Sequence, residues 1–145
     1  MGYRTMSGFL LDTNCISELV RRPDAHVIAW FEAADETLLH LSVLTLGEIR
    51  KGLAGLPQSR RRSNLETWLE ADLRERFARR IIPIDDAIAE RWGWLAAQSR
   101  RRGKPLPVID GLIAATALEH NLTVVSRNLV DFSAAGVPAL NPWIE

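Results

Sequence analysis

The sequence predicts an α/β fold in which a mainly parallel sheet of four or five strands is covered by helices on both faces. Short apolar segments alternate with longer amphipathic segments, and this alternation favours right-handed crossovers between parallel strands. The first apolar segment, Phe9 to Leu11, has no polar position, which is typical of a strand buried on both faces. At 145 residues, 47% of them hydrophobic, the chain is long enough for one core. We therefore expect a single domain over residues 1–145, with residues 1–7 as a flexible extension.

Four segments are predicted to form strands, and a further segment is a candidate for a fifth. Phe9 to Leu11 is the first, and the alternating segment Leu39 to Leu44 is the second. Ile81 to Ile84 is the third, where Pro83 indicates a strand end or a sheet edge. The fourth is Thr123 to Ser126, and Pro138 to Trp143 contains a short fifth.

Three helical regions separate these strands. Leu65, Leu69, Leu73 and Phe77 recur every four residues, which predicts an amphipathic helix or helix pair over residues 59–80. A similar pattern predicts a helix over residues 85–103, and a helix opened by Pro107 is expected to end near residue 121.

Composition excludes several classes of protein. The single cysteine, Cys15, rules out an intramolecular disulfide. No segment has the features of a signal peptide or the ~20 apolar residues of a membrane span, so we expect a soluble cytoplasmic protein without a membrane partner. The net charge of zero argues against binding nucleic acid by bulk attraction.

The charge is nevertheless unevenly distributed. Residues 59–104 carry 12 Lys and Arg against 7 Asp and Glu, a net +5, which leaves −5 for the remainder of the chain. Three basic runs contribute: Arg60 to Arg62, Arg79-Arg80, and Arg100 to Arg102 with Lys104. Each run has two interpretations, one as a phosphate-binding rim and the other as a solvated helix end stabilised by cations.

Four acids lie at junctions between predicted strands or loops and helices: Asp12, Glu48, Asp110 and Asp131. Each has a structural interpretation. Asp12 suits a helix cap, Glu48 suits a capping box with Thr45, Asp110 suits a first helical turn, and Asp131 suits a turn after Asn128. Taken together, these junctions should converge on one edge of the sheet, where ligands usually bind.

Carboxylates gathered at one edge repel one another unless a cation is present. The three histidines, His26, His40 and His120, lack metal-ligand spacing and are interpreted as structural. Oxygen ligands without a histidine or cysteine cluster favour Mg²⁺ or Mn²⁺ over zinc. The four acids therefore predict a magnesium or manganese site.

Four segments together carry a family resemblance. They are Leu10 to Asn14, Leu46 to Gly52, Asp110 to Ala117 and Val125 to Phe132. In this order, the chain resembles the PIN-domain nucleases, and among them the VapC toxins of bacterial toxin–antitoxin pairs. The FitB-like branch of these toxins similarly closes on Asn-Pro-Trp, as Asn141 to Trp143 does here.

The resemblance implies a three-layer α/β/α domain whose clustered acids bind Mg²⁺ or Mn²⁺ and cleave RNA. Asp12, Glu48 and Asp110 match the three most regular acids of the family. For the fourth acid, relatives use either the position of Asn128 or that of Asp131. The resemblance therefore leaves two candidates to complete the site, Asp131 as a fourth acid and Asn128 as a neutral oxygen donor. Supporting roles then fall to Thr13, Asn14 and Ser126, a serine where relatives often carry threonine.

The family also implies partners. We expect an RNA substrate of the tRNA or rRNA class, a homodimer or larger heteromeric complex, and a cognate DNA-binding antitoxin that covers the acidic cleft. Arg50, Lys51 and Arg127 lie near the site motifs and are candidates for phosphate contacts. Trp92 and Trp94 are about 200° apart on one helix and cannot both face the same side, so one of them is a candidate for a second surface.

Two other function classes remain open from the sequence. A catalytically inactive PIN-like module would bind RNA or protein with the same fold and without cleavage. A receiver-like domain would need a lysine after the last strand, and no lysine follows Lys104. Metal-dependent RNA cleavage distinguishes the enzyme from both.

Overall fold

Five parallel strands form the central sheet of the protein, in the order β3-β2-β1-β4-β5. They are β1 (Phe9–Leu11), β2 (Leu39–Ser42), β3 (Ile81–Ile82), β4 (Thr123–Val125) and β5 (Ala139–Leu140). This computed structural model describes residues 8–20 and 23–144. The parallel sheet is confirmed, with β3 at one edge as Pro83 indicated. The expectation of a flexible extension at residues 1–7 lies outside the described residues.

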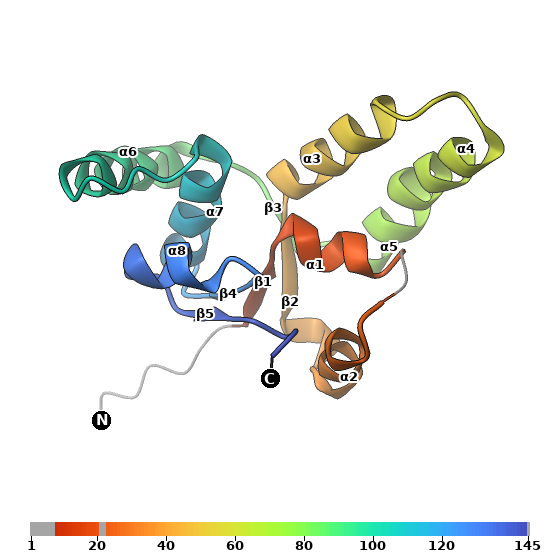
Figure 1. Cartoon of the computed structure of the whole chain (residues 1–145), viewed down its shortest axis with the longest axis horizontal. Coiled ribbons are helices and arrows are strands. Elements are labelled where there is room, and N and C mark those ends of the chain that lie inside the picture. Colours follow the sequence, from red (N-terminus) through yellow and green to blue (C-terminus); the bar gives the residue numbers. More distant parts are fainter. Residues whose placement is uncertain (1–7, 21–22, 145) are drawn as a thin grey trace.

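Helices cover both faces of the sheet and make three layers (Figure 1). One layer contains α1 (Thr13–Glu18), α2 (Ala25–Ala33), α3 (Val43–Ala54), α4 (Arg60–Thr67) and α5 (Arg74–Arg76). The other contains α6 (Asp86–Arg101), α7 (Val108–Glu119) and α8 (Leu129–Ala134). A short 3₁₀ turn, η1 (Glu36–Leu38), leads into β2.

The two central strands supply side chains to two separate cores. Leu11 and Val125 are fully buried in the core under α1 to α5, whereas Leu10 and Val124 are fully buried in the core under α6 to α8. This alternation follows from the period of two in a strand. It explains why Phe9 to Leu11 has no polar position, since both faces of β1 are covered.

The second strand is shorter than the sequence predicted. Residues 43 and 44 belong to α3, because the Ser42 side chain accepts a hydrogen bond from the Leu44 amide at 3.0 Å and caps the helix. The apolar alternation through Leu44 arose from a buried strand followed directly by a helix whose first two residues, the exposed Val43 and the half-buried Leu44, are also apolar. Both patterns place apolar residues at similar short spacing.

The helical region predicted over residues 59–80 is one continuous segment with an irregular middle. A π-helical stretch, η2 (Trp68–Leu73), joins α4 to α5. Leu69, Leu73 and Phe77 are buried, as the four-residue spacing indicated. The wider π turn lets these residues keep facing the core, because a spacing of four otherwise drifts around a helix of 3.6 residues per turn.

A glycine allows α6 and α7 to pack closely. A Cβ atom on Gly111 would lie 3.0 Å from two ring atoms of Trp92. Trp92 is partly buried against this core, while Trp94 is 67% exposed. The two tryptophans therefore lie on different sides of α6, as their spacing predicted, and Trp94 is the exposed one.

Within residues 8–20 and 23–144, no helix has the length and apolar character needed to cross a membrane.

Candidate active site

The candidate site lies at the carboxyl ends of β1 and β4, the two central strands. From β1 the chain continues to β2 on one side, and from β4 it continues to β5 on the other. Such a reversal of strand order opens a crevice in α/β sheets, and ligands bind there. Asp12 directly follows β1 and Ser126 directly follows β4, so both lie at this crevice.

Asp12 is an acid held in a buried position by hydrogen-bond donors. Its side chain is 6% exposed. Ser126 Oγ donates to Asp12 Oδ2 at 2.8 Å, and the Thr13 amide donates to Oδ1 at 2.8 Å. Burial raises the pKa of Asp12, while the donors from Ser126 and Thr13 oppose that rise. Asp12 also caps α1, as the sequence suggested, so the same carboxyl group serves as a helix cap and lies in the candidate site.

Asn14 and Ser126 extend this arrangement across the crevice. Asn14 Nδ2 lies 3.4 Å from Ser126 Oγ and 3.5 Å from Asp12 Oδ2. Asn14 Oδ1 accepts from the Arg127 amide at 3.3 Å. Asn14, Ser126 and the backbone amide of Arg127 therefore connect the ends of β1 and β4 around the Asp12 carboxylate.

Glu48 is not part of a capping box, and that interpretation is wrong. Because α3 begins at Val43, Thr45 lies inside the helix and Glu48 is in its second turn. The Thr13 hydroxyl donates to Glu48 Oε1 at 2.6 Å, which connects α3 to α1. Thr45 Oγ1 is buried and has no hydrogen-bond partner within the described part of the chain.

Asp110 approaches from the opposite layer. It lies in the first turn of α7, after Pro107 as predicted, and Asn128 Nδ2 lies 3.3 Å from its Oδ2. Burial raises the pKa of Asp110, and the charges of Asp12, Glu48 and Asp131 raise it further. Four acids distant in the sequence therefore interact electrostatically in the fold.

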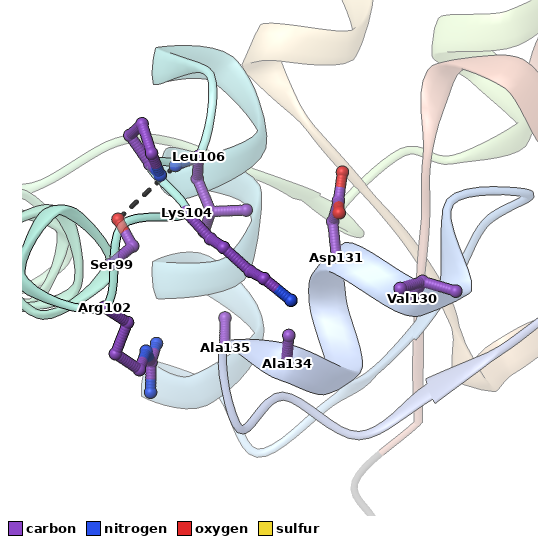
Figure 2. A pocket seen from close by; sticks show the side chains of 9 residues that line it. Ser99, Arg102, Lys104, Leu106, Val130, Asp131, Ala134 and Ala135 are labelled. Carbon is purple, nitrogen blue, oxygen red and sulfur yellow. Dashed lines mark hydrogen bonds between the residues drawn. The ribbon is translucent and has the colours of Figure 1, made fainter.

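Asp131 occupies the margin of this group. It lies in the first turn of α8, where the sequence suggested a turn, and its side chain lines a neighbouring cavity with Lys104 (Figure 2). Asn128 is nearer the centre, because its amide nitrogen donates to Ser126 Oγ at 2.9 Å while its side chain contacts Asp110.

A cavity of about 400 Å³ contains the three other acids. Its wall includes Asp12, Glu48 and Asp110, together with Thr13, Asn14, Ser17, Glu18, Arg127 and Trp143. The Arg127 guanidinium lies 4.2 Å from the ring centre of Trp143. Sequence reasoning identified Arg127 but missed Trp143, Ser17 and Glu18 as wall residues. The closing Asn-Pro-Trp segment was the available signal for Trp143.

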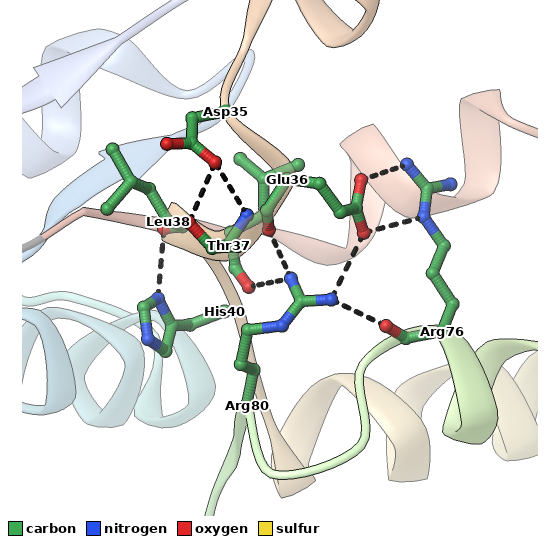
Figure 3. Close-up of polar contacts among 8 residues, drawn as sticks. Asp35, Glu36, Thr37, Leu38, His40, Arg76 and Arg80 are labelled. Atoms are coloured by element: carbon green, nitrogen blue, oxygen red, sulfur yellow. Dashed lines mark hydrogen bonds and ion pairs between the residues drawn. The ribbon is translucent and has the colours of Figure 1, made fainter.

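The arginine runs have different environments. Arg76 and Arg80 bind Glu36 at 3.0 and 3.2 Å, and Arg80 also donates to the carbonyl oxygens of Glu36 and Leu39 (Figure 3). Arg80 therefore has a structural role before β2, and its side chain is not available as a phosphate-binding rim. In contrast, Arg102 and Lys104 from the third run line the cavity beside Asp131.

The donor chemistry of the site fits a hard divalent cation. Within residues 8–20 and 23–144, the acids Asp12, Glu48, Asp110 and Asp131 have no salt-bridge partner within 4.0 Å. Carboxylates placed together without a basic partner are stabilised by Mg²⁺ or Mn²⁺, which prefer oxygen ligands. In their present positions, however, no three acidic, histidine or cysteine side chains among the described residues form a group that could hold a metal ion.

Comparison with known proteins reveals relatives across most of the chain. Residues 9–137 match the model of the PIN domain. The VapC ribonuclease Y4jK of Sinorhizobium fredii is 40% identical over 135 residues, which cover 92% of this chain and 96% of the relative. Toxin FitB of Neisseria gonorrhoeae is 38% identical over 92% of this chain and 97% of its own length. The solved structure of FitAB bound to an IR36 DNA fragment matches with a TM-score of 0.89 and 37% identity, covering 93% of this chain and 95% of that one.

Proposed function

The chain belongs to the PIN-domain family, with VapC and FitB proteins among its relatives, and from this premise we propose that it is a metal-dependent endoribonuclease. It would hydrolyse RNA phosphodiester bonds in the cytoplasm, as the toxin of a toxin–antitoxin pair. The observation that carries this proposal is the convergence of Asp12, Glu48 and Asp110 from three separate elements on one cavity.

Asp12, Glu48 and Asp110 would hold Mg²⁺ or Mn²⁺, with Asp131 as an outer fourth acid. When bound, the cation would supply Lewis-acid stabilisation of the charge that develops on a phosphate during hydrolysis. Ser126 and Thr13 fix the Asp12 carboxylate by donating to its two oxygens. These two donors orient the carboxylate and oppose the rise in the Asp12 pKa that burial causes.

Glu48 is suited to orienting the attacking water. The Thr13 hydroxyl holds Oε1, while Oε2 has no hydrogen-bond partner within the described residues. Oε2 would accept the proton of a water directed at the phosphorus atom. Asn128 would orient Asp110 through its side-chain contact at 3.3 Å. No protein nucleophile is required by this arrangement.

A cognate antitoxin is the proposed partner. A second cavity, of about 190 Å³, shares Thr13, Ser17 and Glu48 with the acidic cavity and continues along Leu53, Leu65 and Trp68. An apolar segment bearing a cationic residue would fill both, since its charge would meet the acids. The antitoxin would supply DNA binding to the complex, and the exposed Trp94 would serve a homodimer contact.

RNA cleavage tests the proposed function. Purified wild type, Asp12→Asn and the control Asp72→Asn would be incubated with total RNA, in Mg²⁺ and in EDTA. Asp72 is exposed in η2 and provides a matched loss of charge away from the site. We expect Asp12→Asn to lose activity on the order of a hundredfold or more, and Asp72→Asn to retain it. New RNA ends at the same positions and in the same amounts from wild type and Asp12→Asn would favour the alternative, a catalytically inactive PIN-like module.

A further inference from the structure

A cavity of about 520 Å³ lies beside the acidic cavity, between the end of α6 and α8. Asp131 lines it from α8, and Asn128, the cap of the same helix, contacts Asp110 of the acidic cavity at 3.3 Å, so the two sites are neighbours. Figure 2 shows the Lys104 side chain reaching across the opening toward α8, with Asp131 on the far side. Apart from Asp131, no residue of this cavity has a role in the proposed hydrolysis.

The loop that presents Lys104 is held in place by hydrogen bonds. The Lys104 amide donates to the Ser99 carbonyl at 3.0 Å, and the Leu106 amide donates to Ser99 Oγ at 3.4 Å. Ser99 itself is 2% exposed. Gly103 has φ +73°, a left-handed conformation that suits glycine at a helix end. The fold therefore fixes the base of Lys104 in front of the cavity.

The walls of the cavity combine cations with an aliphatic surface. Arg102 and Lys104 are exposed and have no salt-bridge partner among the described residues, unlike Arg76, Arg80 and Arg91. Val130, which is 76% exposed, provides an aliphatic side chain on the opposite wall. Leu106 adds a second aliphatic side chain.

We propose that this cavity binds one nucleotide of the RNA substrate, adjacent to the phosphate that is cut. Lys104 and Arg102 would contact a phosphate, and Val130 and Leu106 would contact the sugar and base. An arginine guanidinium also stacks on bases in single-stranded RNA. The cavity provides the positive charge that RNA needs beside three acids. The inference rests on the proposed function, because it places the strand relative to the acidic cavity.

Methyl NMR of the wild type tests the binding step without any cleavage. The methyl signals of Val130 and Leu106 would be followed while nucleoside 5′-monophosphates are added in the absence of metal. Inorganic phosphate and a short glutamate peptide serve as controls for charge alone. We expect the nucleotides to shift these methyl signals more than either control. Equal shifts from the glutamate peptide would overturn the proposal in favour of an acidic protein segment.

Two variants identify the cations responsible, and a third is their matched control. Lys104→Gln and Arg102→Gln should each weaken nucleotide binding about three- to tenfold, whereas Arg101→Gln should leave it unchanged. Arg101 carries the same charge on the same helix end and does not line the cavity. Unchanged nucleotide binding in Lys104→Gln and Arg102→Gln would also overturn the proposal.

Steady-state cleavage of a single-stranded RNA 12-mer separates this inference from the proposed function. Lys104→Gln should raise KM about three- to tenfold with little change in kcat. It should also make the plot of log(kcat/KM) against log salt concentration less steep by about one, which corresponds to the loss of one phosphate contact. Wild-type cleavage with KM unaffected by Lys104→Gln would contradict the inference alone. Absence of any wild-type cleavage would contradict the proposed function, while the NMR result would still report on the cavity.

Discussion

Replacing Ser126 by alanine should destabilise the protein more than its small size suggests. Ser126 is fully buried, its hydroxyl donates to Asp12 Oδ2 at 2.8 Å, and it accepts from the Asn128 amide at 2.9 Å. In Ser126→Ala the carboxylate of Asp12, which is 6% exposed, loses a charge-assisted donor. The Asn128 amide loses its acceptor at the same time.

The magnitude follows from these two bonds. A hydrogen bond to a charged group contributes about 1.5–3 kcal/mol, and a neutral one about 0.5–1.5 kcal/mol. The free energy of unfolding should therefore fall by about 2–4.5 kcal/mol. For a chain of this size, that corresponds to a decrease in Tm of about 4–18 °C.

Thermal unfolding followed by circular dichroism at pH 7 measures the loss, with Ser133→Ala as the control because Ser133 is exposed in α8. The Ser126 donor lowers the pKa of Asp12, so its contribution is present above that pKa and disappears as pH falls through it. The difference from wild type should shrink at low pH. A Tm within about 1 °C of wild type at pH 7, or a deficit that does not change with pH, would show that the Ser126 hydroxyl does not stabilise the ionised Asp12.

Three further predictions follow from other contacts. Gly111→Ala should lower the free energy of unfolding by about 1–3 kcal/mol, because the new Cβ would lie 3.0 Å from the Trp92 ring. The loss should be smaller in a Trp92→Phe background. Equal losses in the two backgrounds would contradict a clash with the Trp92 ring. A double-mutant cycle of Arg127→Gln and Trp143→Leu, read by urea unfolding, should give a coupling energy of about 0.5–2 kcal/mol, whereas additive effects would show that the stacking contributes nothing. Without divalent metal, Asp110→Asn should become more stable than wild type as pH rises through the raised pKa of Asp110. The reason is that the wild-type carboxyl then ionises beside three other acids. A difference in unfolding free energy between the two proteins that does not change with pH would contradict this.

The fold was predictable from the sequence wherever local pattern and tertiary packing agree. The buried strand β1 and the parallel crossovers follow from apolar runs separated by helical periodicity. The boundary at Ser42 did not follow, because apolar residues continue into the helix and only the Ser42 cap, a single hydrogen bond, ends the strand. Helices α2 and α8 were also not predicted, and α8 is only 6 residues long. Segments as short as α8 carry little periodic signal.

The candidate site was predictable in its residues and less so in its contacts. Asp12, Glu48 and Asp110 were identified because each lies near the start of a helix, and topology brings such positions to one sheet edge. The bond between Thr13 and Glu48 spans 35 residues of sequence, so no local pattern indicates it. The position of Trp143 over Arg127 likewise depends on the path of the chain after β5.

Anomalous diffraction from crystals soaked in Mn²⁺ would show whether the acids beside the carboxyl ends of β1 and β4 hold the cation used in RNA cleavage. We expect an anomalous peak in the cavity lined by Asp12, Glu48 and Asp110. The same peak should be absent from Asp110→Asn crystals of unchanged fold. Wild-type crystals with no manganese in this cavity, at a concentration that supports RNA cleavage in solution, would contradict this expectation.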